Sequence, residues 1–377
     1  MKDQFKYFRF ARHSIYQLLS LFNRFVWIFL PRSFQFHQGE KFNDFEPKSG
    51  DCLLLYRDFN ASNVHALSNI ALNISELLRV RGLGHMTTSV RNGNVFLGNA
   101  AWTKRQIIEN GPDYVFIADP QLIGLPGPIG ILQCLYLVLL CKRKRCRVIL
   151  VLFDLPDPQG SLFGSILSRF GANVLSVCND PAESLTYSNI KDAIGPAGEI
   201  CHRFDGGAQI KRISERTIDI HLPRPSYSPR KEFVEEMLPI LLEKNLKVTI
   251  GGTYKRYDDL VRDMRNTKIV VVTNSLISGC VGRWPLPDGP RSHIVSYNYE
   301  ALRSGALLLS EATKPMEAIF EDGIEYQSFE DTEDLLNKIS FFTENQDVAE
   351  RIAIAGTEKY ARMVKDQAML HALFDRK

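Results

Sequence analysis

Short, strongly apolar runs that alternate with helix-forming segments constrain the fold of this chain more than any other feature. Three clear examples are Asp113–Ala118 (DYVFIA), Val148–Phe153 (VILVLF) and Ile269–Val272 (IVVV). Runs of this kind suit strands buried on both faces of a sheet, because a half-exposed strand alternates with polar residues. Strand–helix alternation therefore predicts an α/β fold with parallel sheets and helices on both faces.

The alternation occurs twice, on either side of a weakly patterned, charged and glycine-rich segment at 181–217. A chain of 377 residues is also too long for one ordinary hydrophobic core. We therefore predict two Rossmann-like domains, 50–215 and 216–377, that face each other across a cleft, with the final helix packing back on the first domain. An N-terminal helical extension and linker, residues 1–49, precedes them.

The composition excludes several classes of protein. The net charge is only +3, so no nucleic-acid partner is expected. Seven scattered cysteines, without a CxxC pair, read as reduced thiols and favour a cytoplasmic protein. The sequence contains no GxGxxG, Walker A, HExxH, GxSxG or DxD motif, so neither a metal nor a bound cofactor is predicted.

Residues 1–32 are basic and rich in aromatic side chains, with six Lys or Arg against one acid, Asp3. They lack the clean apolar core and the cleavage site of a signal peptide. Two readings stay open: an amphipathic helix on the inner membrane face, or a helix that packs on the protein or a partner. The apolar segment 129–141 with its basic tail at 142–147 raises the same question. We favour a buried crossover helix for its apolar part and leave the basic run open.

The most informative stretch for function is His293–Glu311. Glu300 is predicted to open a helix, Gly305 to end it, and Ala306–Leu309 to form a buried strand. A carboxylate at such a junction suits the hydroxyl groups of a ligand. The plain alternative is an ordinary acid at a helix start.

Further candidate residues occur in order along the second half of the chain. Basic side chains in a strand–helix turn suit a diphosphate, and paired glycines allow a close approach of the backbone. The structural alternatives are a solvated turn for the basic residues, a tight turn for the paired glycines and an exposed strand start for Lys268. The candidates are Arg224, Tyr227, Arg230, Lys231, Gly251, Gly252, Lys268 and Glu325.

Together these pieces resemble the C-terminal domain of GT-B-fold glycosyltransferases, in the spore-maturation-type branch of the family 1 group. The sequence segments that carry this resemblance are the R-x-x-Y-x-x-R opening, the GG strand end, NTKIVVV, YEALRSGALLLSE, IFEDGIEYQSFEDTEDLLNKI and AERIAIAGTEKY. The resemblance covers residues 218–360, whereas 50–180 is similar only to a generic Rossmann-like domain. It implies a nucleotide-diphosphate sugar held mainly by the C-terminal domain, without a metal.

The resemblance also assigns roles. Glu300 would accept hydrogen bonds from the donor ribose, and Arg224, Arg230 or Lys231 would attend the phosphates. The chain departs from its relatives at Ser292, where many have an acid, and at Tyr297, where this branch favours an Arg. A replacement cation would come from Arg283, Arg291 or His293.

The acceptor side is less determined. Asp119 and Asp154 each follow a predicted strand of the first domain and are the candidate catalytic bases, with His65 and His85 as weaker ones. Helix or turn capping is the alternative for each Asp. We predict a glycosyltransferase acting on a glycan or lipid-linked acceptor. The competing readings are a nucleotide-sugar epimerase of the same fold and a catalytically inert GT-B-like binding protein.

Overall fold

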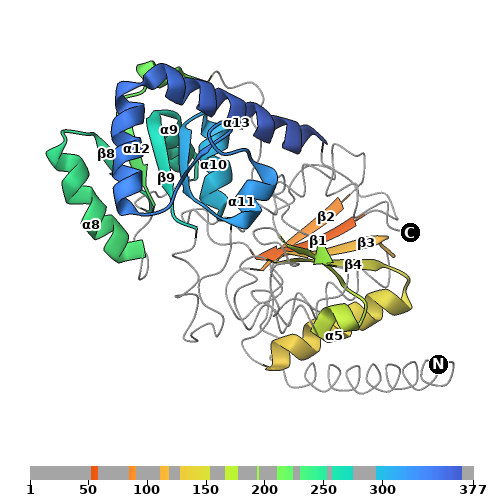
Figure 1. Ribbon diagram of the computed structural model, residues 1–377. Coiled ribbons are helices and arrows are strands. Elements are labelled where there is room, and N and C mark those ends of the chain that lie inside the picture. The colour runs from red at the N-terminus through yellow and green to blue at the C-terminus, as the bar shows by residue number, and fades with distance from the viewer. Residues whose placement is uncertain are drawn as a thin grey trace.

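The computed structural model describes the chain in segments: residues 52–57, 85–90, 111–118, 128–152, 166–176, 193–194, 210–223, 230–252, 257–274 and 294–366. These segments build two parallel sheets, which Figure 1 shows as two separate bodies. The predicted extension at 1–49 lies outside the described residues, and the predicted domain boundaries stay predictions.

The first sheet has six parallel strands in the order β2-β1-β3-β4-β5-β6. The strands are β1 (Cys52–Arg57), β2 (His85–Val90), β3 (Tyr114–Ala118), β4 (Arg147–Leu152), β5 (Asn173–Ser176) and β6 (Ala193–Ile194). The side chains of Val115–Ile117 and Val148–Val151 are buried, as the continuous apolar runs predict.

The second sheet has five parallel strands in the order β11-β10-β9-β7-β8. The strands are β7 (Ile218–Leu222), β8 (Val248–Ile250), β9 (Thr267–Val272), β10 (Leu307–Glu311) and β11 (Gln327–Phe329). The helices around it are α8 (Arg230–Glu243), α9 (Tyr257–Arg265), α10 (Ser296–Ser304), α11 (Lys314–Ile319), α12 (Thr332–Glu344) and α13 (Gln346–Asp366).

Alternation along the strands gives the second sheet two different faces, because successive side chains point to opposite sides. On one face, apolar residues of β7 to β11 form a single core with α8, α12 and the start of α13. On the opposite face the intervening residues meet α10. These include His221 of β7, which stacks on Tyr297, and Ser310 of β10, which hydrogen-bonds to Asn298. The α10 face is thus more polar than the core face.

Several predicted elements need correction. Glu300 does not open its helix, because α10 begins at Ser296 and places Glu300 in the second turn. The sequence pattern predicts separate helices at 347–355 and 357–374, on either side of Gly356, but residues 346–366 form one continuous helix, α13. Gly356 fits inside it because the backbone carbonyl of Glu325 occupies the space where a Cβ would lie. The short elements α11 and β11 were not predicted, because each spans too few residues to show a period.

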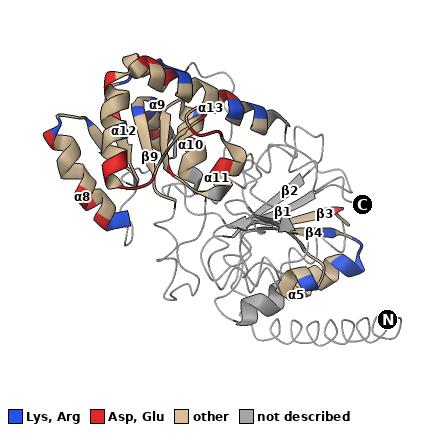
Figure 2. Ribbon diagram, in the orientation of Figure 1, with Lys and Arg blue, Asp and Glu red and all other residues tan. Residues whose placement is uncertain are grey.

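The apolar segment at 129–141 forms α5 (Pro128–Arg143), and its Leu135–Cys141 side chains are buried. This confirms a buried crossover helix for the described apolar part. Lys142 and Arg143 lie in its last turn, where cations interact favourably with the helix dipole. Figure 2 shows blue at this end of α5. No helix in the described part of the chain has the length and hydropathy needed to span a bilayer.

Candidate functional site

The strand order of the second sheet defines where a ligand is expected. From β7 the chain moves through α8 to β8 on one side, whereas β9 lies on the other side of β7 and continues through α10 to β10. The connections thus diverge between β7 and β9, and open α/β sheets bind ligands at the carboxyl ends of such a pair. The residues that follow these two strands form the candidate site.

Helix α10 brings Glu300 to this edge. The helix follows β9 in the chain and begins at Ser296, and the Glu300 side chain in its second turn is only 4% exposed. The N-cap residue, Val295, makes no side-chain cap, whereas α11 and α12 are capped by Thr313 and Asp331. The first turn of α10 therefore presents backbone N–H groups that its own N-cap side chain does not cover.

Two stacked rings, those of Tyr297 and His221, join the first turn of α10 to β7. The ring of Tyr297, three residues before Glu300, stacks on His221 of β7 with centroids 6.0 Å apart and planes inclined by 22°. His221 Nδ1 is 2.9 Å from the Thr249 hydroxyl of β8. Burial lowers the pKa of His221 to about 4, so its imidazole is neutral at physiological pH. Tyr297 replaces the Arg expected by resemblance and packs on an uncharged ring.

Arg230 links the two connections across the switch point. It is the first residue of α8, after β7, and its Nη2 donates to the backbone carbonyl of Thr273, after β9, at 3.3 Å. The Thr273 hydroxyl is buried and has no hydrogen-bond partner among the described residues. Gly251 also reaches this edge, where its N–H donates to the Leu222 carbonyl at 2.9 Å. Gly252 has φ 96°, which explains why a glycine is needed there.

Lys231 lies in the same first turn of α8 as Arg230. Its ammonium group pairs with Glu235 at 3.6 Å, and both side chains are more than half exposed. An exposed pair of this kind releases its cation easily. Lys231 is therefore near the candidate site without being fixed in it.

The structure does not bring Lys268 and Gly305 together with Glu300. Lys268 lies at the start of β9, the opposite edge of the sheet, and pairs with Asp219 at 2.8 Å. Gly305 ends α10 in a left-handed conformation, with φ 72°, just before β10 begins. A Cβ there would overlap Ile210 and lie 2.9 Å from Arg216 Nη2.

Arg216, which the sequence did not single out, organises this opposite edge. Its guanidinium donates to the carbonyls of Lys211, Met264, Thr267 and Ser304. Burial lowers its pKa to about 10. It thus joins the ends of α9 and α10 to the start of β9.

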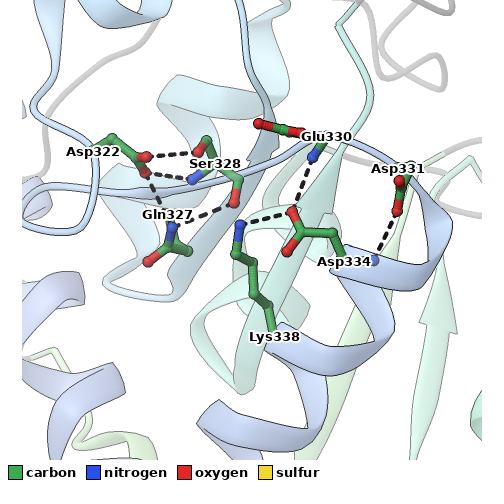
Figure 3. A network of polar contacts seen from close by, with 7 residues as sticks. All are labelled: Asp322, Gln327, Ser328, Glu330, Asp331, Asp334 and Lys338. Carbon is green, nitrogen blue, oxygen red and sulfur yellow. Dashed lines mark hydrogen bonds and ion pairs between the residues drawn. The ribbon is translucent and has the colours of Figure 1, made fainter.

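Glu325 also lies away from Glu300, in the turn that precedes β11. Its carboxylate accepts from the Glu321 N–H at 3.0 Å and is 4.0 Å from Arg362 of α13. The acidic residues near Glu325 in the chain have local partners (Figure 3). Asp322 accepts from the N–H and hydroxyl of Ser328, and Asp331 caps α12. The second oxygen of Asp334 accepts from both Lys338 and the Glu330 N–H.

The remaining candidates, apart from His85 as the first residue of β2, lie outside the described residues. They are Arg224, Tyr227, Arg283, Arg291, His293, Asp119, Asp154 and His65. The neighbouring strands are described, however. Leu222 ends β7 two residues before Arg224, and Ala118 ends β3 immediately before Asp119. In the first sheet the connections diverge between β1 and β3. Asp119 therefore follows a switch-point strand, whereas Asp154 follows the next strand along, β4.

Comparison with known proteins agrees with this geometry. Residues 230–372 match the family described as glycosyl transferase-like. The match is confined to the C-terminal part of the chain. The match contains α10 with Glu300, Arg230 at its start, and all of β8 to β11. No match was found among curated protein sequences.

Solved structures of glycosyltransferases share the fold of most of the chain. A glycosyltransferase from Rickettsia africae ESF-5 has a TM-score of 0.52 and 13% identity, covering 87% of this chain and 100% of that one. The sucrose-phosphate synthase of Thermosynechococcus elongatus has 0.52 and 10%, over 86% and 98%. An α-glucosyltransferase in complex with UDP-glucose and DNA has 0.50 and 11%, over 86% and 98%. The two parallel sheets are thus those of a GT-B glycosyltransferase fold.

Sequence reasoning missed the polar residues that hold α10 in place. Asn274, Asn298 and Ser310 are all fully buried and hydrogen-bonded to one another. One signal was present in the sequence. Ser310 ends the apolar run Leu307–Leu309, and Asn274 follows the run Ile269–Val272 by two residues. A polar residue at such a position must find a partner when buried.

Proposed function

We propose that the chain is a glycosyltransferase that moves a sugar from a nucleotide diphosphate to an acceptor hydroxyl. The observation that carries the proposal is the junction of Arg230, Thr273 and α10 at the β7–β9 switch point, within the glycosyl transferase-like part of the chain. It offers a cation, a buried hydroxyl and helix N–H groups to a diphosphate, and the Glu300 carboxylate to a ribose.

In this proposal each group has a separate task. Arg230 and the first turn of α10 attract the phosphate oxygens and stabilise the charge that develops on the leaving diphosphate. Glu300 accepts hydrogen bonds from the two ribose hydroxyls. Arg224, Tyr227, Lys231, Gly251, Gly252 and His293 complete the proposed donor site, whereas Lys268, Gly305 and Glu325 are left out of it because they lie elsewhere.

The donor is tested by calorimetry with the full chain and UDP, GDP and ADP. UDP-glucose is the first sugar donor to try, since one structure of similar fold holds it. We expect one nucleoside diphosphate to bind, and slow hydrolysis of the matching sugar donor to follow. No binding of any of the three would overturn the proposal. Binding without hydrolysis or transfer would favour an inert protein, and interconversion of sugar epimers an epimerase.

The role of Glu300 is tested by pairing a protein change with a ligand change. Two charged hydrogen bonds are worth about 3 kcal/mol together, so Glu300→Gln should weaken binding roughly 100-fold. Loss of the 2′-hydroxyl from the nucleotide should weaken binding to the wild type but not to the variant. Glu325→Gln is the matched control, and we expect it to leave both affinities unchanged. Equal discrimination by wild type and Glu300→Gln would remove Glu300 from the site.

On the acceptor side we propose Asp119 as the first candidate for the catalytic base and Asp154 as the second. Asp119 is preferred because it follows β3, a switch-point strand of the first sheet. Asp119→Asn should lower kcat about 100-fold with the donor KM unchanged, in line with the usual contribution of a general base. A larger loss of kcat in Asp154→Asn would reverse this order.

We further propose that residues 1–32 place the enzyme on the inner face of the membrane, where a lipid-linked acceptor would be reached. The support is their basic and aromatic composition. Flotation with anionic liposomes, with and without residues 1–32, tests it. Equal flotation of the full and truncated chains would remove the membrane from the account.

A further inference from the structure

Three buried polar side chains join the elements that meet at the candidate site. Asn274 follows β9, Asn298 is the third residue of α10, and Ser310 lies near the end of β10. All three are 0% exposed. Each comes from a different part of the fold, so together they join the carboxyl ends of β9 and β10 to the first turn of α10, the helix that carries Glu300.

The three side chains form a closed ring of hydrogen bonds. Asn274 Nδ2 donates to Ser310 Oγ at 2.7 Å, Ser310 Oγ donates to Asn298 Oδ1 at 2.8 Å, and Asn298 Nδ2 donates to Asn274 Oδ1 at 2.7 Å. Every donor in the ring points the same way around it. Bonds arranged in this way strengthen one another in a low-dielectric interior.

The remaining capacity of the two amides is used on the backbone around α10. Asn274 Nδ2 also donates to the Glu311 carbonyl at 3.1 Å, and its Oδ1 accepts from the Val295 N–H at 3.4 Å. Asn298 Nδ2 also donates to the Val295 carbonyl at 3.1 Å. Val295 is the N-cap residue of α10 and has no side chain that could cap. The ring therefore satisfies the N–H of the N-cap residue from the sheet, a role that the N3 side chain has in a capping box.

We propose that the Asn274–Asn298–Ser310 ring positions the first turns of α10, and so sets the affinity for the nucleotide donor. The inference rests on the proposed function and names the positioning residues of that same site. The ring itself does not touch the donor, since its members are buried and satisfied by one another. It acts through α10, whose N–H groups and Glu300 carboxylate must meet the donor at fixed distances.

The opposite end of α10 supplies a matched control. Ser304 is also buried, donates to the Ala301 carbonyl at 2.7 Å, and accepts from the Ala306 N–H at 3.4 Å. Ser310 likewise donates one hydrogen bond to a side chain and accepts another. The same change, serine to alanine, thus removes a similar pair of bonds at either end of one helix. Only Ser310 belongs to the ring.

The experiment compares Ser310→Ala with Ser304→Ala in the full chain. Thermal denaturation gives the stability of each variant, and calorimetry at a temperature well below both transitions gives the affinity for whichever of UDP, GDP or ADP binds the wild type best. We expect similar losses of stability, but an affinity about tenfold weaker for Ser310→Ala and within about twofold of wild type for Ser304→Ala. With a sugar donor, Ser310→Ala should raise KM more than it lowers kcat.

A milder variant keeps the test open if Ser310→Ala does not fold. Ser310→Cys retains a group of similar size that bonds only weakly, so its affinity should lie between wild type and the alanine variant. Equal affinities for the Ser304 and Ser310 variants would overturn the inference and reduce the ring to a structural element. Absence of binding by the wild type would instead overturn the proposed function, and the inference with it.

Discussion

The two ends of α10 are held to the same sheet by opposite kinds of chemistry. At its start, the three neutral side chains of Asn274, Asn298 and Ser310 form a closed ring. At its end, one buried cation, Arg216, reaches carbonyls of the neighbouring elements, among them that of Ser304. A charge at the far end stabilises the helix C-terminus, whose dipole is negative. A cation packed against the start would oppose the positive end of the helix dipole. A neutral ring avoids this repulsion at the end where a donor is proposed to bind.

This difference predicts that changes at the far end cost stability alone, whereas changes at the near end also cost donor affinity. The largest loss of stability should come from Arg216→Ala. It leaves several buried carbonyls without donors, so we expect a loss of about 4 kcal/mol in the free energy of unfolding. Urea denaturation followed by circular dichroism measures it. Nucleotide affinity of the folded fraction should stay at the wild-type value; a parallel loss would merge the two ends into one unit.

The next effect concerns pH at the near end. The folded pKa of His221 is about 4, below its ordinary value of 6.5, because burial disfavours the charged ring. Between these values the unfolded chain binds a proton that the folded chain does not, so stability falls as the pH drops from 6.5 toward 4. The expected loss is about 3 kcal/mol. The difference between wild type and His221→Gln, measured from pH 7 to pH 4, isolates it, and a pH-independent difference would contradict the buried neutral imidazole.

Gly305→Ala should have a smaller effect at the far end. The position has φ 72°, and a Cβ would press on Ile210 and Arg216. We expect about 2 kcal/mol of destabilisation, since left-handed backbone and displaced neighbours both raise the energy of the folded state. Gly323→Ala is a control with similar φ but open space around the Cβ. A loss as large in the control would show that backbone strain alone is measured.

The smallest effect tests Lys268, which the sequence places in the donor site and the structure places at the far edge. Its pair with Asp219 is partly buried, at 19% and 17% exposed, so Lys268→Ala should cost about 1 kcal/mol and no donor affinity. Lys231→Ala removes a far more exposed pair and should leave stability unchanged within error. A tenfold loss of nucleotide affinity in Lys268→Ala would return this residue to the site.

The sequence predicted the strands well because buried parallel strands are continuous apolar runs. β9 begins two residues before the predicted run Ile269–Val272 and ends with it, and the end of α10 was marked by Gly305. The helix start was missed because Val295 is an apolar N-cap without a capping side chain, so no Ser, Thr, Asp or Asn signalled it. The helix boundary predicted at Gly356 was wrong for a related reason. A glycine inside a helix resembles a helix end, and the close contact with the Glu325 carbonyl that requires this glycine cannot be read from the sequence.

The candidate site was predicted less evenly. Residues in the first turns of helices that follow strands, such as Glu300 and Arg230, could be placed because topology sends the carboxyl ends of parallel strands to one edge. Lys268 and Glu325 resemble site residues in linear order, but Lys268 lies at the start of β9 and Glu325 precedes β11, so both lie at the opposite edge. Asn274, Asn298 and Ser310 could not be connected from sequence, since their bonds depend on distances between elements.

The neutrality of the ring has a consequence for how the protein responds to its surroundings. None of its three side chains titrates between pH 2 and pH 12, and none attracts counterions. The placement of α10 should therefore be insensitive to ionic strength and cellular acidity. A salt dependence of donor binding would therefore measure the attraction of Arg230 and the helix N-terminus for the phosphates. It would not reflect a change in the shape of the site.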